Sequence, residues 1–390
     1  MTLRMVEQQH RQVLTTATVL GLSCSSPEFT IRQDEAATLA QELRVSERWL
    51  HALPALYRKS RVNQRGSVLI ERDYGPPMDR QSFYQVASAE FPRGPSTDQR
   101  MQMYTEKAGA LLIQACRAAI ANSHLSASTI THIVTVSCTG FTAPGLDLQV
   151  IDELKLQSDC ARTHVGFMGC HGAINGIRIA KAIVESNPDA VVLLGAVELC
   201  SLHQQYSDDA QQLVANSLFA DGAAAMVIGA NSTEDSTGES IEDSALPWTI
   251  ASTMSQILPG TSDLMSWQIN NFGFQMSLDP KVPDKIQASL APVISKWLGD
   301  ENLDPSEIDA WAIHPGGPRI VEASGAALGL DKSQLEHSFS ILRDYGNMSS
   351  PTVLFILDRL SKADPSAQNA VLLAFGPGLC MEACLLTRVR

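Results

Sequence analysis

The amino-acid sequence predicts an α/β protein made of layered sheets and helices. Short apolar runs recur along the chain, and each is nearly continuous, as is typical of strands that are buried on both faces. Longer segments with helical spacing of their apolar residues alternate with these runs. Alternation of strands and helices over this length of chain indicates a layered α/β fold. The expected strands are 15–22, 132–138, 190–198, 223–228, 310–313 and 370–375, and the expected helices are 97–123, 170–186, 283–298, 319–328 and 347–360.

A faint internal repeat predicts two similar βαβ-rich halves. In each half a strand leads into a glycine-containing turn. The matching segments are 136–145 with 312–317, and 191–198 with 371–378. The polar segment 231–244 is rich in Ser, Asp, Glu and Gly, which is typical of a solvated connector. We therefore expect an N-terminal half at 1–235 and a C-terminal half at 236–390.

The composition excludes several classes of protein. The chain has 390 residues, of which 44% are hydrophobic and 18% charged, and this describes a globular protein with a large core. A net charge of -13 argues against nucleic acid as the main partner. No apolar run reaches the roughly 18 residues that span a membrane, so no integral membrane segment is expected. The apolar stretch near the N-terminus lacks a strongly basic region before it, and we expect a first strand there instead of a secretion signal.

The eight cysteines are spread thinly, without a CxxC pair. Cys380 and Cys384 are four residues apart with no histidine nearby. A zinc site or a disulfide framework is therefore not expected, and neither is any other metal site. Reduced thiols in a cytoplasmic protein fit this spacing better.

One cysteine lies in an unusually glycine-rich segment at 165–176. Cys170 is placed where a turn enters the helix expected at 170–186, and small residues at 169, 172, 173 and 176 would clear one face of that helix. The partial positive charge of a helix N-terminus lowers a thiol pKa and favours the nucleophilic thiolate. A buried, inert cysteine in a packing helix is the alternative, and the segment alone does not separate the two.

Two further polar residues accompany this cysteine. His314 ends the strand expected at 310–313 and is followed by Pro-Gly-Gly-Pro, and sites gather at strand ends in α/β folds. A hydrogen-bonded core histidine is the alternative. Asn347 opens the helix expected at 347–360, where an ordinary N-cap is the alternative. The Cys, His and Asn segments together favour a shared site more than each does alone.

These segments resemble those of the type III polyketide synthases, the chalcone and stilbene synthase superfamily, over nearly the whole chain. The matching motifs are the cysteine segment, His314-Pro-Gly-Gly-Pro318, Gly346-Asn-Met-Ser-Ser350, Phe219-Ala-Asp-Gly222 and Phe375-Gly-Pro-Gly378. The resemblance implies a thiolase fold, in which two pseudo-duplicated βαβ halves form a layered αβαβα architecture. The N-terminal half would carry the nucleophilic cysteine, and the C-terminal half the catalytic histidine and asparagine.

The resemblance also implies a reaction. Cys170 matches the acyl-carrying nucleophile, and His314 matches the partner that holds its thiolate as an ion pair. Asn347 matches the residue that, with His314, binds the malonyl thioester carbonyl and stabilises the enolate left by decarboxylation. The implied chemistry is repeated decarboxylative Claisen condensation of malonyl-CoA onto an acyl-CoA starter. It needs no metal or redox cofactor.

Two related enzyme families offer alternatives to the type III polyketide synthase assignment. Ketoacyl synthase III and HMG-CoA synthase use the same residue types, but the former typically has His-Gln-Ala-Asn where this chain has His314-Pro-Gly-Gly. A single-extension ketoacyl synthase III-like enzyme therefore remains the weaker enzymatic alternative. An inactive thiolase-fold binding subunit is the non-enzymatic one, and the presence of Cys170, His314 and Asn347 together argues against it.

The substrate cavity departs from the plant pattern. Phe219 matches a gatekeeper ring, and Glu198 matches an organising residue near the site. Met276 occupies the position of the second gatekeeper phenylalanine of the plant enzymes. Ala143 occupies the position of a plant methionine that reaches across the subunit interface. Cys138, Cys200 and His203 occur where the plant enzymes have threonines that line the cavity. Trp267 occurs where the plant enzymes usually have a small residue. The remaining expected substrate-binding residues are Thr139, Ser349, Gly376, Pro377 and Gly378.

These departures predict a softer, locally wider apolar cavity. We therefore expect a medium- or long-chain fatty acyl-CoA starter and an alkylpyrone or alkylresorcinol product. A chalcone or stilbene synthase-type reaction with an aromatic starter is the alternative, in which case the changes are ordinary repacking.

The segment 57–65 is the clearest basic patch, and Lys59, Arg61 and Arg65 are the expected CoA-binding residues. A solvated helix end is the alternative. The family resemblance implies a homodimer with an interface near Ala143. The starter could also arrive on an acyl carrier protein.

Overall fold

The computed structural model describes residues 15–230 and 247–388, so the expected connector and the boundary at 235/236 lie outside the described residues. Nine strands form one mixed sheet in the order β11-β12-β13-β8-β1-β7-β6-β4-β5. Their bounds are β1 Ala17–Ser25, β4 His132–Ser137, β5 Ala161–Gly166, β6 Val192–Leu199, β7 Asp221–Ala230, β8 Thr249–Ile257, β11 Ala310–Ile313, β12 Asn369–Gly376 and β13 Cys380–Thr387.

The two ends of this sheet repeat one pattern of pairing. β4 runs parallel to β6, and β6 and β1 each run antiparallel to β7. In the same way β11 runs parallel to β12, and β12 and β8 each run antiparallel to β13. The halves join through a single pair between β1 and β8, Thr18 with Thr249. The pseudo-duplication expected from the internal repeat is therefore present in the topology.

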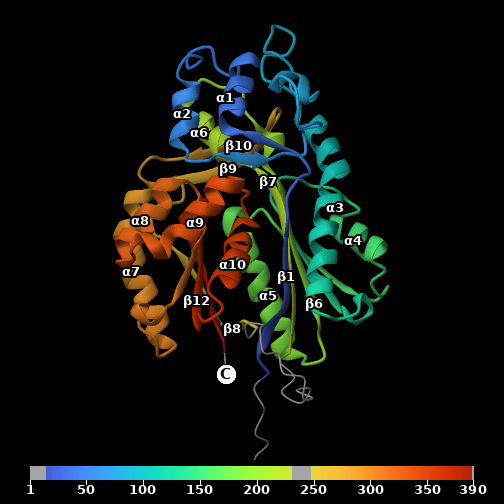
Figure 1. Ribbon diagram of the computed structural model, residues 1–390, viewed down its shortest axis with the longest axis vertical. Helices are drawn as coiled ribbons and strands as arrows, with labels where there is room; N and C mark the ends of the chain where they lie inside the picture. The colour runs from blue at the N-terminus through green and yellow to red at the C-terminus, as the bar shows by residue number, and fades with distance from the viewer. Residues whose placement is uncertain (1–14, 231–246, 389–390) are drawn as a thin grey trace, which may run out of the picture.

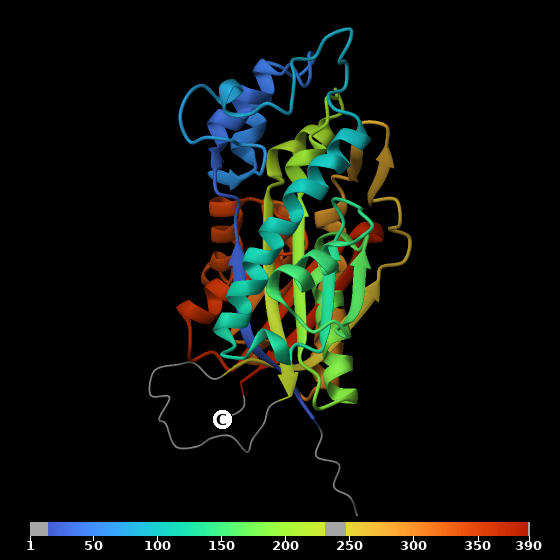
Figure 2. The ribbon, with the colours of Figure 1, turned by 90° about the vertical axis from the view of Figure 1, so that its right-hand side faces the viewer.

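Helices and half-sheets alternate in five layers, which confirms the expected αβαβα architecture. Strand residues alternate between faces, so that Ile133 packs in an outer core while Val134 packs in the central one. The central core contains α5 (Gly172–Ser186) and α10 (Thr352–Ala363) between the two half-sheets. One outer core is covered by α3 (Thr97–Asn122) and α4 (Leu146–Leu154), and the other by α7 (Val282–Asp300) and α8 (Pro318–Leu328) (Figure 1). Figure 2 shows α3 lying across the strands of the N-terminal half.

A smaller layer covers one end of the sheet, at the top of Figure 1. It contains the short helices and hairpins that frame the site. These are β2 Thr30–Arg32, α1 Gln33–Glu42, α2 Leu53–Lys59, β3 Gln64–Gly66, α6 Ala210–Leu218, β9 Met265–Asn270 and β10 Gly273–Leu278. β6 ends under this layer, and its last residues lead directly into the site.

The helix expected at 347–360 begins later than predicted. α10 starts at Thr352, and α9 (Lys332–Tyr345) ends just before Asn347. The Asn347 N–H donates to the Leu218 carbonyl at 2.9 Å, and the Asn347 carbonyl accepts from the Ala220 N–H at 2.8 Å. Because these backbone groups pair with a distant segment, Asn347 lies in a loop and is not the N-cap of α10.

Candidate active site

Cys170 lies in a single 3₁₀ turn, Gly169–His171, that leads into α5. Gly169 has a φ of +73°, and a Cβ there would lie 2.5 Å from Cδ of Pro377, so only glycine fits. Further along the helix, a Cβ at Gly176 would lie 2.6 Å from Cδ1 of Leu194. The expected clearing of one helix face is confirmed, and it lets α5 lie against β6.

His314 and Asn347 are buried, and both have polar atoms without a partner. His314 is 1% exposed, and neither ring nitrogen has a hydrogen-bond partner among the described residues. Asn347 is fully buried; its Oδ1 accepts from the Ser349 N–H at 2.8 Å, but its Nδ2 is unpaired in the described structure. A buried polar group without a partner costs about 1–3 kcal/mol. The hydrogen-bonded core histidine is therefore not what the structure shows. Neither side chain is among the residues that line the cavity beside Cys170, which is described below.

The Cys170 thiol lies beside Ser349 and Asn347. Burial raises the pKa of Cys170 to about 11, while the polar side chains of Ser349 and Asn347 beside the thiol act in the opposite direction. Burial also lowers the pKa of His314 to about 3, and the charge of nearby His171 adds to that effect. The expected lowering of the Cys170 pKa by the helix start is wrong, because burial dominates. Each group alone favours its neutral form, so a thiolate–imidazolium pair forms only where the two charges stabilise each other.

Glu198, the penultimate residue of β6, lies directly behind this site and is fully buried. Its carboxyl group accepts hydrogen bonds from the Cys138 N–H at 3.0 Å, Thr139 Oγ1 at 2.7 Å and Ser350 Oγ at 2.5 Å. Burial raises the pKa of this carboxyl, and these donors partly offset the effect. The group ties the end of β4 to the loop that carries Asn347.

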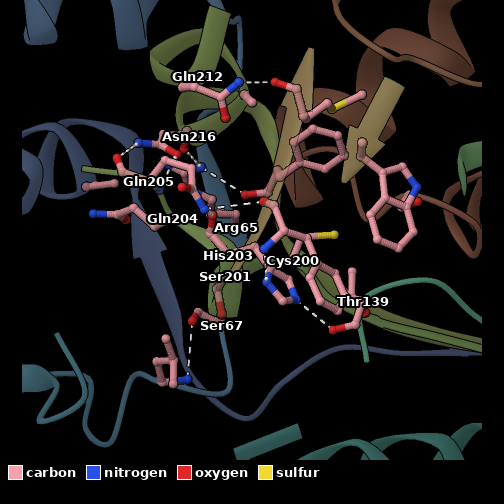
Figure 3. Close-up of a pocket in the computed structure, with 18 of the residues that line it drawn as sticks. Arg65, Ser67, Thr139, Cys200, Ser201, His203, Gln204, Gln205, Gln212 and Asn216 are labelled. Carbon is pink, nitrogen blue, oxygen red and sulfur yellow. Dashed lines mark hydrogen bonds between the residues drawn. The ribbon is translucent and has the colours of Figure 1, made fainter. Parts of the chain in front are cut away.

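A cavity opens from Cys170, with an empty volume of about 1210 Å³ that includes its mouth. Figure 3 shows the labelled part of its lining. The residues expected at the substrate site that do line it are Cys138, Thr139, Cys200, His203, Phe219, Trp267, Met276, Ser349 and Pro377.

Four residues expected at the substrate site do not line the cavity of this chain: Glu198, which lies behind the site as described above, and Ala143, Gly376 and Gly378. Ala143 is exposed in the loop after β4. Gly376 is needed for packing, since a Cβ there would lie 2.3 Å from the ring of His171. Gly378 has a φ of +75° and its carbonyl accepts from Thr261 Oγ1 at 3.1 Å, so it shapes a turn.

A row of aromatic rings forms one wall of the cavity. His203 stacks on Phe274 with ring centroids 4.1 Å apart, and Trp267 stacks on the same ring at 4.9 Å. Burial lowers the pKa of His203 to about 3. The neutral ring is held at both nitrogens: Nε2 donates to the Thr139 carbonyl at 2.6 Å, and Nδ1 accepts from the Phe274 N–H at 3.1 Å. Phe274 was not predicted, although its place two residues before Met276 on β10 puts both on one face of the strand.

The expected CoA-binding residues divide into two kinds. Arg65 is 7% exposed, and its Nη1 donates to the carbonyls of Asn216 at 2.7 Å and Phe219 at 2.9 Å. The prediction that it contacts a phosphate at the surface is therefore wrong, because its donors hold the backbone beneath Phe219. Lys59 is exposed at the end of α2, and Arg61 is exposed and forms an ion pair with Glu322 at 2.7 Å.

Other kinds of site have little support in the described ranges. No group of three or more His, Cys, Asp or Glu side chains is placed there to hold a metal ion. All eight cysteines lie in the described part of the chain and are free thiols there. Among the helices of residues 15–230 and 247–388, none is long and apolar enough to cross a membrane.

Comparisons with known proteins agree with these features. Models of the chalcone and stilbene synthases match the chain, the N-terminal domain at residues 7–232 and the C-terminal domain at 249–390. The alpha-pyrone synthesis polyketide synthase-like Pks18 of Mycobacterium tuberculosis is 33% identical over 380 residues, covering 96% of this chain and 92% of that protein. The 1,3,6,8-tetrahydroxynaphthalene synthase of Streptomyces peucetius subsp. caesius is 34% identical, covering 71% and 72%. The crystal structure of PKS-I from the brown alga Ectocarpus siliculosus superimposes with a TM-score of 0.87 at 29% identity, covering 97% of this chain and 100% of that one.

Proposed function

Because this chain belongs to the chalcone and stilbene synthase family and is a type III polyketide synthase, we propose that it extends a medium- or long-chain fatty acyl-CoA with malonyl-CoA. The extended chain then closes to an alkylpyrone or alkylresorcinol. The fatty acyl starter follows from the apolar cavity beside Cys170. The lactone product is favoured by similarity to a relative that is named for alpha-pyrone synthesis.

In the proposed reaction, the Cys170 sulfur attacks the starter thioester and expels CoA, and His314 takes the thiol proton and passes it to the leaving group. Malonyl-CoA then binds with its thioester carbonyl toward His314 and Asn347. Loss of CO₂ leaves an enolate, whose negative oxygen accepts hydrogen bonds from these side chains. The enolate carbon attacks the acyl thioester and releases the Cys170 thiolate. No step requires a metal or redox cofactor.

The observation that carries the assignment is the set of unpaired buried atoms on His314 and Asn347. Burying polar groups without partners is unfavourable, and such groups are retained where a ligand completes their hydrogen bonding. The Asn347 amide also lies beside the Cys170 thiol, so that a carbonyl bound to the amide would sit close to the acyl group.

Product analysis tests the starter. Purified enzyme is incubated with malonyl-CoA and acyl-CoAs of four to twenty carbons, with coumaroyl-CoA as the aromatic comparison, and products are identified by mass spectrometry. We expect pyrones or resorcinols with alkyl chains of medium or long length. Much faster turnover of coumaroyl-CoA than of lauroyl- or palmitoyl-CoA would contradict the fatty starter. Release of a single-extension β-keto acid would instead indicate a ketoacyl synthase III-like reaction.

Acylation of Cys170 separates catalysis from a binding role. Intact-protein and peptide mass spectrometry after incubation with acyl-CoA should show a mass increment on the peptide that contains Cys170, and Cys170→Ala should show none. Absence of an increment with every acyl-CoA would favour an inactive binding subunit. An acyl carrier protein that bears the same acyl group can be tested as donor in the same assay.

A homodimer is part of the proposal. Phe141 and Phe167 are 66% and 52% exposed. They follow β4 and β5, which are adjacent parallel strands, so the two rings emerge from the same end of the sheet. Aromatic residues are enriched in the cores of protein–protein interfaces. They lie close in sequence to Ala143, where the family resemblance places the interface.

A further inference from the structure

A second buried histidine, His171, lies beside the active site and has no part in the reaction described above. It follows Cys170 in the turn that leads into α5 and is 4% exposed. The Cys170 thiol lies beside Ser349, whereas the His171 ring packs against the bare Cα of Gly376 in β12, where a Cβ would lie 2.3 Å from the ring. The two neighbouring side chains therefore meet different parts of the fold.

His171 begins a polar stripe along α5, which lies between the two half-sheets (Figure 1). Its Nδ1 lies 2.7 Å from Asn175 Oδ1, and because this amide oxygen can only accept, the ring donates from Nδ1. Arg178 follows Asn175 by three residues and lies on the same face of the helix. Its Nη2 donates to the Met254 carbonyl of β8 at 3.2 Å, so the stripe faces the C-terminal half-sheet.

The C-terminal half-sheet presents a buried carboxylate to this stripe. Glu382 of β13 forms an ion pair with Arg178, and it accepts a hydrogen bond from Ser255 Oγ at 2.7 Å. These contacts hold the carboxylate in the central layer, in which His171 also lies.

The sheet register places His314 in the row of this carboxylate. Ile313 pairs with Leu373 across β11 and β12, so His314 comes next to Ala374. Ala374 in turn pairs with Glu382 across β12 and β13, and it packs in the central core. Residues that are opposite in neighbouring strands share a face, so His314 and Glu382 both point toward α5.

The same strand relates the two histidines. Gly376, which carries the His171 ring, lies two residues beyond Ala374 and on the same face of β12, about 7 Å further along the strand. The charge of His171 accordingly acts on His314. Two imidazole rings at this spacing titrate as a coupled pair, because a charge on one opposes a charge on the other.

The surroundings favour His171 as the first of the two to be charged. Burial lowers the pKa of His171, but its hydrogen bond to Asn175 and the charge of Glu382 act in the opposite direction. In the described structure neither ring nitrogen of His314 has a partner, and burial lowers its pKa to about 3. A proton that enters the pair is therefore held better by His171.

The other ionisable groups around His171 leave this order unchanged. Arg178 opposes a charge on His171, but its own charge is balanced by the ion pair with Glu382. From β12 the ring meets Gly376, which has no ionisable side chain. Cys380 pairs with Gly376 across the sheet, and burial, with a smaller effect of Glu382, raises the pKa of its thiol, which stays neutral when the histidines titrate.

From this arrangement we infer that His171 is a positioning residue for the thiol proton, because it competes with the catalytic His314 for the same positive charge. A neutral His171 leaves His314 able to take the proton from the Cys170 sulfur. A charged His171 makes His314 a weaker base, so thiolate formation slows as the pH falls through the range in which His171 gains its proton. The inference rests on the proposed roles of Cys170 and His314 and adds the residue that sets their response to pH.

Alkylation of Cys170 by iodoacetamide, followed on the labelled peptide by mass spectrometry, measures thiolate formation. His171→Asn keeps an N–H donor near the position of Nδ1 but cannot be protonated. It should raise the ratio of the rate at pH 5.5 to the rate at pH 8 at least about threefold over the wild type, which corresponds to about half a pH unit. His164→Asn makes the same change at a half-buried histidine of β5 that bonds to Thr135, and it should leave the ratio unchanged.

The outcomes separate this inference from the proposed reaction. An unchanged ratio for His171→Asn, or an equal loss of rate at both pH values, would overturn the inference, because a purely structural role moves no pH profile. His314→Gln should slow the alkylation of Cys170. If it does not, the proposed role of His314 itself fails.

Histidine NMR tests the order of protonation in the wild-type protein, whatever the stability of His171→Asn. The protein is labelled with ¹³C at the histidine Cε1 and titrated from pH 8.5 to pH 5. The His314 signal is assigned with His314→Gln, and the His171 signal through its contact with Asn175. We expect His171 to gain its proton at a higher pH than His314, and the reverse order would overturn the inference.

Discussion

The buried carboxyl group of Glu198 offers a quantitative test of how the site is held together. Glu198→Gln keeps the shape of the side chain but replaces one acceptor oxygen by an NH₂ donor. In the wild type, the donors that face the two carboxyl oxygens are the Cys138 N–H and the hydroxyls of Thr139 and Ser350. Whichever way the new amide turns, its NH₂ group faces a donor where an acceptor stood.

The structure sets the magnitude of this change. A lost neutral hydrogen bond costs about 0.5–1.5 kcal/mol, and a buried donor left unpaired costs about 1–3 kcal/mol. One such mismatch predicts that Glu198→Gln lowers the free energy of unfolding by about 1–3 kcal/mol at pH values where the wild-type carboxyl group is ionised, and by more at lower pH. Burial raises the Glu198 pKa in the folded protein, so the folded state binds this proton more tightly than the unfolded chain does. The stabilising contribution is complete below the unfolded carboxyl pKa of about 4.3 and is lost as pH rises through the folded value, so the deficit of the Gln variant shrinks toward higher pH.

Urea titrations of wild type and variant at pH 5, 6, 7 and 8, at one protein concentration, measure this difference. The exposed Glu301→Gln is the matched control and should stay within about 0.5 kcal/mol of the wild type at each pH. A Glu198→Gln variant as stable as the wild type near pH 5 would refute the hydrogen-bond argument. A deficit that does not change with pH would refute the raised pKa.

Three further changes test other parts of the site. Ser349→Ala removes a hydroxyl group that lowers the Cys170 pKa, so alkylation of Cys170 by iodoacetamide should slow at a fixed pH and its profile should move to higher pH; an unchanged profile would place the hydroxyl away from the thiol. Arg65→Gln should lower the free energy of unfolding by about 2–4 kcal/mol because it leaves buried carbonyls unpaired. Lys59→Gln should leave stability unchanged and raise the KM for malonyl-CoA. A raised KM with unchanged stability for Arg65→Gln would instead indicate that Arg65 binds a CoA phosphate. Phe141→Asp should convert a dimer to a monomer in light scattering, and a monomeric wild type would contradict the proposed homodimer.

Much of the site could be predicted because its signals are local in sequence. Gly169 is specified by its backbone conformation, and Gly172 and Gly176 by close packing, as predicted for the segment around Cys170. The apolar runs that became β4, β6, β7, β11 and β12 are continuous because both faces of these strands are buried. Within the large sheet, β5, β8 and β13 were not predicted, and neither were the strands of the two small hairpins, β2, β3, β9 and β10. β8 faces solvent along part of its length, with a mixed burial pattern, and it lacks a clear period.

The sequence by itself determined the fold class, the two-half architecture and the three residue types that define the chemistry. Only the tertiary structure decided how those residues are used. It buried Arg65 beneath Phe219 although its neighbours are basic and exposed, and it paired the Asn347 backbone with Leu218 and Ala220 instead of starting a helix. Both outcomes depend on segments more than a hundred residues apart, which no local pattern records. The Cys170 pKa follows the same rule, because desolvation by the surrounding fold outweighs the helix start that the sequence places beside it.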